Sequence, residues 1–198
     1  MTPYIELKRM AAELTKRFDC ALFGSLGLAL TYPEVLDNPP GDADLVAGNE
    51  QKNLKGIIQF LQANGYTVYS WEEPVTEGFD MEILRGRFYI RGIKHIPPYK
   101  PAIIDVTYEL KGIDNRQILR MTTTKEGIRI LNIDGYIMAL GICEKAKHLQ
   151  ERELLIKRKN MIQEKQKKEQ TLLFGMKNKL TFATQNRKRL SNGLRLRK

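Results

Sequence analysis

The 198-residue sequence contains only two cysteines, one tryptophan and no long uncharged apolar run. A membrane-spanning helix needs roughly 18 or more apolar residues in a row, so no membrane insertion is expected. The charged N-terminus MTPYIELKRM also lacks the apolar centre of a signal peptide. Cys20 and Cys143 have no metal-site spacing, and two reduced thiols are expected. These absences favour an intracellular, cytoplasmic protein.

Acidic residues are scarce near the end of the chain. Residues 144–198 contain 17 Lys and Arg but 5 Asp and Glu, a net charge of +12, whereas residues 1–143 carry −2. The 42% hydrophobic content is sufficient for a buried core. The sequence therefore predicts a folded domain at 1–130, followed by a basic helical extension and tail at 131–198 that contacts a polyanion.

Hydrophobic periodicity predicts a mixture of helices and strands. Helical spacing covers residues 4–17 and 49–65, and a further helix can begin at Ser25. Short apolar or alternating segments predict strands, at 20–23, 42–47, 66–71, 79–84, 87–93 and 102–110. From about residue 134, strong helix formers without proline predict one or two long helices. This order indicates an α/β or α+β fold, with a mixed sheet flanked by helices.

Three aspartates lie within predicted strands, where an isolated carboxylate is costly to bury. Asp42 and Asp44 are two residues apart in GDADLV and therefore share one face of their strand, and Asp105 lies in AIIDVTY. If the two strands pair, the three carboxylates converge. Oxygen-only ligands of this kind suit Mg²⁺ or Mn²⁺, and such ions can promote phosphoryl or nucleotidyl displacement.

Gly24 and Ser25 follow the first predicted strand and precede a helix. Glycine permits close approach of a backbone, and the N–H groups at a helix N-terminus attract phosphate. The Ser25 hydroxyl can add a hydrogen bond to a phosphate oxygen. A phosphate site upstream of a carboxylate cluster is what a nucleoside triphosphate (NTP) and its metal ions require.

In this order, the segments resemble the DNA polymerase β-like nucleotidyltransferase superfamily. The signature segments are LFGS (22–25), DADLV (42–46) and IIDV (103–106), and the resemblance covers about residues 5–110. The sequence is similar to small members of the antitoxin-like and abortive-infection-like branch. It differs from many of them in the 16-residue spacer between Ser25 and Asp42, which contains the loop TYPEVLDNPP.

The resemblance implies a nucleotidyltransferase-type mixed sheet and Mg²⁺-dependent transfer of a nucleoside monophosphate from ATP or another NTP to an acceptor hydroxyl. Asp42 and Asp44 would hold both metal ions. Asp105 would complete the second metal site and help to activate the acceptor. A lysine in the first C-terminal helix would lie near the triphosphate, and Lys145 is favoured over Lys147.

The basic C-terminal residues predict contact with nucleic acid, plausibly RNA or a tRNA end as the acceptor. The residues expected to make it are Lys157, Arg158, Lys159, Lys165, Lys167, Lys168, Arg187, Lys188 and Arg189. Several alternatives remain open at this point. The basic run can be a solvated helical face, or it can contact an acidic protein or an anionic membrane surface. The domain can also bind RNA or a ribonucleoprotein without turnover, or the acceptor can be a protein or a small molecule.

Overall fold

The computed structural model describes residues 2–36, 38–76, 79–110, 112–141 and 148–171. It divides the chain into two compact units, Met1–Leu155 and Ile156–Lys198. The boundary that the sequence suggests after residue 130 stays a prediction. Within the described residues, no helix is both long and apolar enough to cross a membrane.

An eight-stranded mixed sheet forms the centre of the first unit, in the order β4-β3-β5-β6-β2-β1-β8-β7. The strands are β1 (Cys20–Phe23), β2 (Ala43–Ala47), β3 (Thr67–Ser70), β4 (Glu73–Pro74), β5 (Tyr89–Lys94), β6 (Ala102–Thr107), β7 (Thr122–Lys125) and β8 (Ile128–Leu131). Strand β2 is parallel to β6, and β1 is parallel to β8, whereas the other neighbours are antiparallel. The predicted fold class, a mixed sheet flanked by helices, is confirmed.

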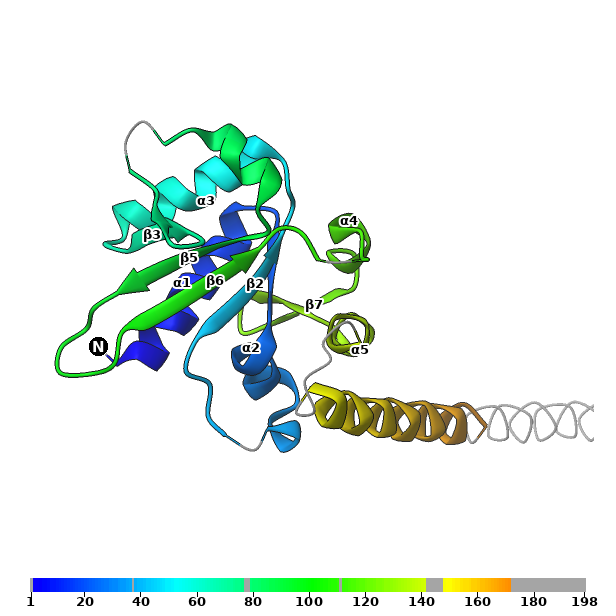
Figure 1. Ribbon diagram of the computed structural model, residues 1–198. Coiled ribbons are helices and arrows are strands. Elements are labelled where there is room, and N and C mark those ends of the chain that lie inside the picture. Colours follow the sequence, from blue (N-terminus) through cyan, green and yellow to red (C-terminus); the bar gives the residue numbers. More distant parts are fainter. Residues whose placement is uncertain (1, 37, 77–78, 111, 142–147, 172–198) are drawn as a thin grey trace, which may run out of the picture. The chain divides into compact units, whose positions relative to one another are not determined.

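Helices flank this sheet. They are α1 (Pro3–Arg17), α2 (Gly24–Thr31), α3 (Gln51–Ala63), α4 (Asn115–Ile118) and α5 (Ile133–Leu140), with 3-10 helices η1 (Pro33–Val35) and η2 (Met81–Gly86). A further helix covers 148–171. Figure 1 shows α1 behind β5 and β6, and β2 beside β6 in the same sheet.

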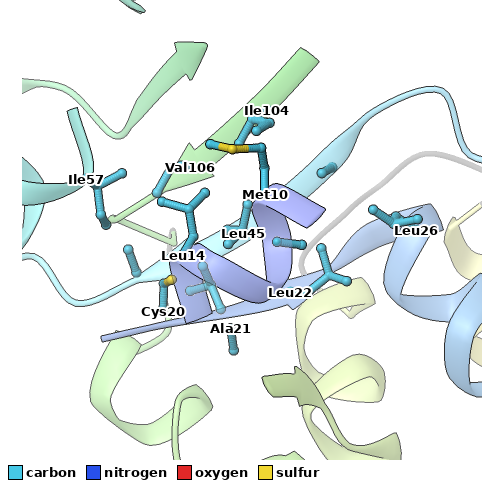
Figure 2. Packing of buried hydrophobic residues seen from close by; sticks show 14 of the residues in the cluster. Met10, Leu14, Cys20, Ala21, Leu22, Leu26, Leu45, Ile57, Ile104 and Val106 are labelled. Carbon is cyan, nitrogen blue, oxygen red and sulfur yellow. The ribbon is translucent and has the colours of Figure 1, made fainter. Parts of the chain in front are cut away.

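The main hydrophobic core lies between α1 and the sheet. Met10 and Leu14 of α1 are fully buried, as are Leu45 of β2 and Ile104 of β6. Figure 2 shows these side chains in one cluster. Because side chains alternate along a strand, burial of Leu45 and Ile104 on this face leaves Asp44 and Asp105 on the other face. Core packing thus fixes the direction in which the aspartates point.

Two sequence-based assignments of local structure need correction. The segment 79–84, predicted as a strand, contributes to the 3-10 helix η2, where the side chain of Asp80 accepts a hydrogen bond from the backbone N–H of Glu82. This N-terminal cap competes with an extended conformation. The hairpin β7–β8 was not predicted. Its turn uses Glu126 and Gly127, which both have positive φ.

Candidate metal and nucleotide site

The sheet brings the three predicted aspartates together. Strands β2 and β6 pair in parallel with Asp44 directly opposite Asp105, and Asp42 lies just before β2. One carboxylate oxygen from each residue lies within 4.8 Å of the others. All three side chains are half-buried. An acidic group that could bind a metal ion is therefore present, and its oxygen-only ligands are the type that hard divalent cations prefer.

Arg91 of β5 is a member of this cluster that the sequence did not predict. Its Nε donates to Asp105 Oδ1 and its Nη2 donates to Asp105 Oδ2, each at 2.7 Å. This two-pronged hydrogen bonding raises the pKa of Arg91 despite partial burial, and the charges of Asp105 and Asp42 act in the same direction. The available signal is the position of Arg91 between Ile90 and Gly92, since a charge inside such a strand needs a partner.

Strand register places the cluster in a row that crosses five strands. In order, the row consists of Tyr69, Arg91, Asp105, Asp44 and Phe23. Directly paired residues project from the same face of a sheet. The carboxylates thus have Arg91 on the β5 side and the end of β1 on the other side.

Gly24 connects the carboxylates to the start of α2. Its φ is +64°, and a Cβ atom built on it would lie 2.0 Å from Asp44 Oδ2. Any larger residue would therefore be strained and would also displace the Asp44 carboxylate. This contact explains in physical terms why glycine precedes Ser25 in this sequence. It also puts the first turn of α2, which contains the half-buried Ser25, beside the aspartates.

A cavity of about 300 Å³ opens at this junction. Its lining includes Ser25, Asp42 and Asp44 and also two residues without a predicted role, Tyr136 and His148. The Tyr136 hydroxyl and His148 Nδ1 are buried and have no hydrogen-bond partner among the described residues. Buried polar atoms normally have partners, so these two atoms indicate a place for a polar ligand.

The Tyr136 hydroxyl is held at the cavity by close packing. A Cβ atom built on Gly27 would lie 2.0 Å from it, so glycine at that position makes room for the phenol. Burial raises the pKa of Tyr136, and the charge of Asp44 and the neighbouring Tyr32 raise it further. The phenol therefore stays protonated and can donate a hydrogen bond. Neither Tyr136 nor His148 has a local sequence signal, because only tertiary packing brings α5 and residue 148 to α2.

The remaining predicted site residues are basic. Lys145, Arg187, Lys188 and Arg189 lie outside the described residues, as does Cys143. The others lie on the 148–171 helix, where all but the half-buried Lys159 are exposed: Lys157, Arg158, Lys159, Lys165, Lys167 and Lys168. Nucleic-acid binding by these residues stays a prediction.

Solved structures that are similar to this chain include two proteins from Helicobacter pylori. JHP933 is 18% identical with a TM-score of 0.45, and the match covers 78% of this chain and 65% of JHP933. A proposed nucleotidyltransferase is 16% identical with a TM-score of 0.41, and the match covers 68% of this chain and 56% of that protein. The chain thus spans less than two thirds of either neighbour. No family model and no curated protein matches it.

Proposed function

We propose that this protein is a metal-dependent nucleotidyltransferase that moves a nucleoside monophosphate from an NTP to an acceptor hydroxyl. The main support is the juxtaposition of three carboxylates within 4.8 Å and the Gly24–Ser25 helix start. The adjoining cavity adds two buried polar atoms without partners among the described residues. Together these groups offer sites for a divalent cation and for phosphate oxygens.

Asp42, Asp44 and Asp105 would hold Mg²⁺ or Mn²⁺. Three carboxylates and the Arg91 guanidinium leave a formal charge of −2, which one divalent ion matches. Bound ions of this kind neutralise charge on phosphoryl oxygens and help to ionise an attacking hydroxyl. Binding of a second ion would draw on Asp105, whose two oxygens both accept from Arg91. Release of Asp105 by Arg91 would free that carboxylate to act on the acceptor hydroxyl.

The cavity residues would bind the triphosphate. Backbone N–H groups in the first turn of α2 and the Ser25 hydroxyl can donate to phosphate oxygens, because a helix N-terminus favours negative charge. The Tyr136 hydroxyl can add a third type of donor, and His148 Nδ1 can donate in the tautomer that carries its proton there. Lys145 would add a positive charge near the triphosphate.

RNA, for example a tRNA end, is the acceptor that we propose. The observation behind this choice is the net charge of +12 in residues 144–198, together with exposed lysines on the 148–171 helix. Several phosphate contacts would give salt-dependent affinity with little dependence on sequence. The first unit, which includes Tyr136 and His148, would supply the chemistry, and the basic residues of the C-terminal extension would hold the acceptor.

One observation favours a second candidate, a domain that binds RNA without turnover. Arg91 engages both oxygens of Asp105 at 2.7 Å, and a permanent pair would leave only two carboxylates for metal ions. Under this candidate function, RNA binding would be independent of both NTP and Mg²⁺.

The first experiment incubates the protein with Mg²⁺, each α-labelled NTP in turn, and total RNA or a protein lysate as acceptor. Transfer of label to RNA is expected, and Asp42→Asn should reduce it at least about a hundredfold because a metal ligand is lost. The matched control is Asp80→Asn, which changes an exposed aspartate at the start of η2 and should retain activity. Equal transfer by both variants would refute the proposal. Transfer of label to protein would show that the acceptor is a protein and not RNA.

A further inference from the structure

Three aromatic side chains gather where β3 ends and β5 begins. Trp71 is 44% exposed and Phe88 is 48% exposed, and Tyr89 is half-buried beside them. The ring centroids of Trp71 and Phe88 are 5.8 Å apart, and those of Phe88 and Tyr89 are 5.3 Å apart. We call these three residues the aromatic platform. They line an open cavity of about 590 Å³.

The aromatic platform is connected to the carboxylate cluster by Arg91. The Arg91 guanidinium carbon lies 5.8 Å from the centroid of the Tyr89 ring, and the same guanidinium pairs with Asp105. Tyr89 and Arg91 are two residues apart in β5 and therefore project from one face. Contacts thus run without interruption from Trp71, through the rings and Arg91, to the aspartates.

The aromatic platform and the cavity that Ser25 lines are on opposite sides of the carboxylates. In the sheet order β5-β6-β2-β1, Arg91 is on the β5 side of Asp105, whereas Gly24 and Ser25 follow β1. Nucleotidyl transfer places the attacking and leaving oxygens roughly in line across the phosphorus atom. If the triphosphate occupies the cavity beside Ser25, the acceptor hydroxyl approaches over β6 and β5.

From this geometry we propose that the aromatic platform binds the terminal base of a single-stranded RNA, whose 3′-hydroxyl is the acceptor. This proposal rests on the proposed function and specifies its acceptor. Bases stack on aromatic rings with little sequence preference, and single-stranded ends expose their faces for this contact. The Arg91 guanidinium contacts both Tyr89 and Asp105, and it can donate hydrogen bonds to the last phosphate of the RNA.

Local structure supports a binding role for Trp71. Its φ is +55°, a conformation that is strained for a bulky side chain, and residues in this state concentrate at binding sites. The Arg87 guanidinium carbon lies 5.5 Å from the Trp71 ring centroid. The same guanidinium forms an ion pair with Glu73, so Arg87 holds the Trp71 ring from one side. Glu72 also lines the open cavity of the platform, and its carboxylate can accept hydrogen bonds from the amino groups of a base.

Trp71 is the only tryptophan in the chain, so its fluorescence reports directly on the platform. The full-length Asp42→Asn protein, which should not turn over, is titrated with a short single-stranded RNA. Quenching of Trp71 is expected, and Phe88→Leu should weaken binding about tenfold because it keeps an apolar side chain but removes the ring. The matched control, Tyr99→Leu, removes another exposed ring, which is 52% exposed, and should bind like the parent.

Binding of Mg²⁺ and NTP is measured separately by calorimetry in proteins that keep Asp42, and it should be equal for Phe88→Leu and Tyr99→Leu. Unchanged fluorescence with RNA, or equal RNA affinity of Phe88→Leu and Tyr99→Leu, would overturn the platform. Equal quenching by NTP alone would show that the platform binds the base of the NTP, and it would overturn the acceptor assignment. Transfer of label to protein that Phe88→Leu does not reduce would overturn the acceptor assignment as well. RNA quenching without any NTP binding would support the platform while refuting the proposed nucleotidyl transfer.

Discussion

Two acidic sites in the first unit differ in how many carboxylates they bring together. Glu6 of α1 is fully buried, and it accepts hydrogen bonds from Arg9 at 2.9 and 3.0 Å and from Lys94 at 2.8 Å. The Tyr66 hydroxyl lies 3.4 Å from the same carboxylate. One carboxylate here pairs with two cations, whereas three carboxylates lie together in the aspartate cluster, where Arg91 pairs with Asp105.

The difference separates a structural acid from one suited to bind a ligand. Glu6 ties α1 to β5 through Lys94, and a buried charge with complete partners needs nothing further. The aspartates are close enough to repel one another, and the fold keeps them together through strand register and the Asp44–Gly24 contact. Such stored repulsion is relieved when a cation binds.

The largest effect on stability should come from removing the charge of Glu6. Glu6→Gln removes the charge that compensates Arg9 and Lys94, and loss of one partner of a buried pair typically costs about 3–5 kcal/mol. Because the two cationic side chains are 41% and 25% exposed, we expect about 2–3 kcal/mol in the free energy of unfolding. Denaturant titration measures this loss, and transferase activity of the folded protein should be retained.

The matched control for that experiment is Glu13→Gln. Glu13 pairs with Arg17 on the surface of the same helix, and exposed pairs of this kind contribute little to stability. Similar losses for both substitutions would show that Glu6 is no more important than an ordinary surface charge, and the comparison of the two sites would fail.

The sequence could predict the aspartates but not their environment. Asp44 and Asp105 lie in apolar strands, and Asp42 lies just before β2. Alternation predicts a common face for Asp42 and Asp44, and the parallel pairing of β2 and β6 then aligns Asp105 with them. The roles of Arg91 and Tyr136 depend on which strands and helices become neighbours. Local patterns contain no such information.

The fold was predictable for similar reasons. Amphipathic segments such as α3 have strong periodicity, and their positions were predicted within a few residues. The strand predicted at 79–84 failed because side-chain capping by Asp80 outweighs the apolar composition of FDMEIL. The β7–β8 hairpin contains several threonines, Thr122, Thr123 and Thr124, whose strand preference is expressed only when β8 pairs with β1.

A smaller effect of opposite sign is expected at the aspartate cluster. Asp42→Asn removes one of three like charges without changing side-chain volume, and in the absence of divalent ions it should stabilise the fold by roughly 0.5–1 kcal/mol. Added Mg²⁺ should stabilise the parent protein more than the variant and remove this advantage. Thermal unfolding with EDTA and with Mg²⁺ measures both differences, with Asp80→Asn as the control. A variant less stable than the parent under both conditions would argue against stored repulsion.

The smallest effect concerns pH and isolates Glu6 from other carboxylates. Burial alone would raise its pKa, but hydrogen bonds from Arg9 and Lys94, together with their charges, more than offset burial and lower the pKa below its ordinary value near 4.5. A lowered folded-state pKa means that Glu6 contributes stability above pH 4.5 and loses it as the pH falls toward the folded-state value. The gap in unfolding free energy between the parent and Glu6→Gln should therefore be constant near neutral pH and narrow below about pH 4.5. Denaturant titrations of both proteins across this range measure the gap. If the gap widened in acid, the folded-state pKa of Glu6 would be raised, and Arg9 and Lys94 would not offset its burial.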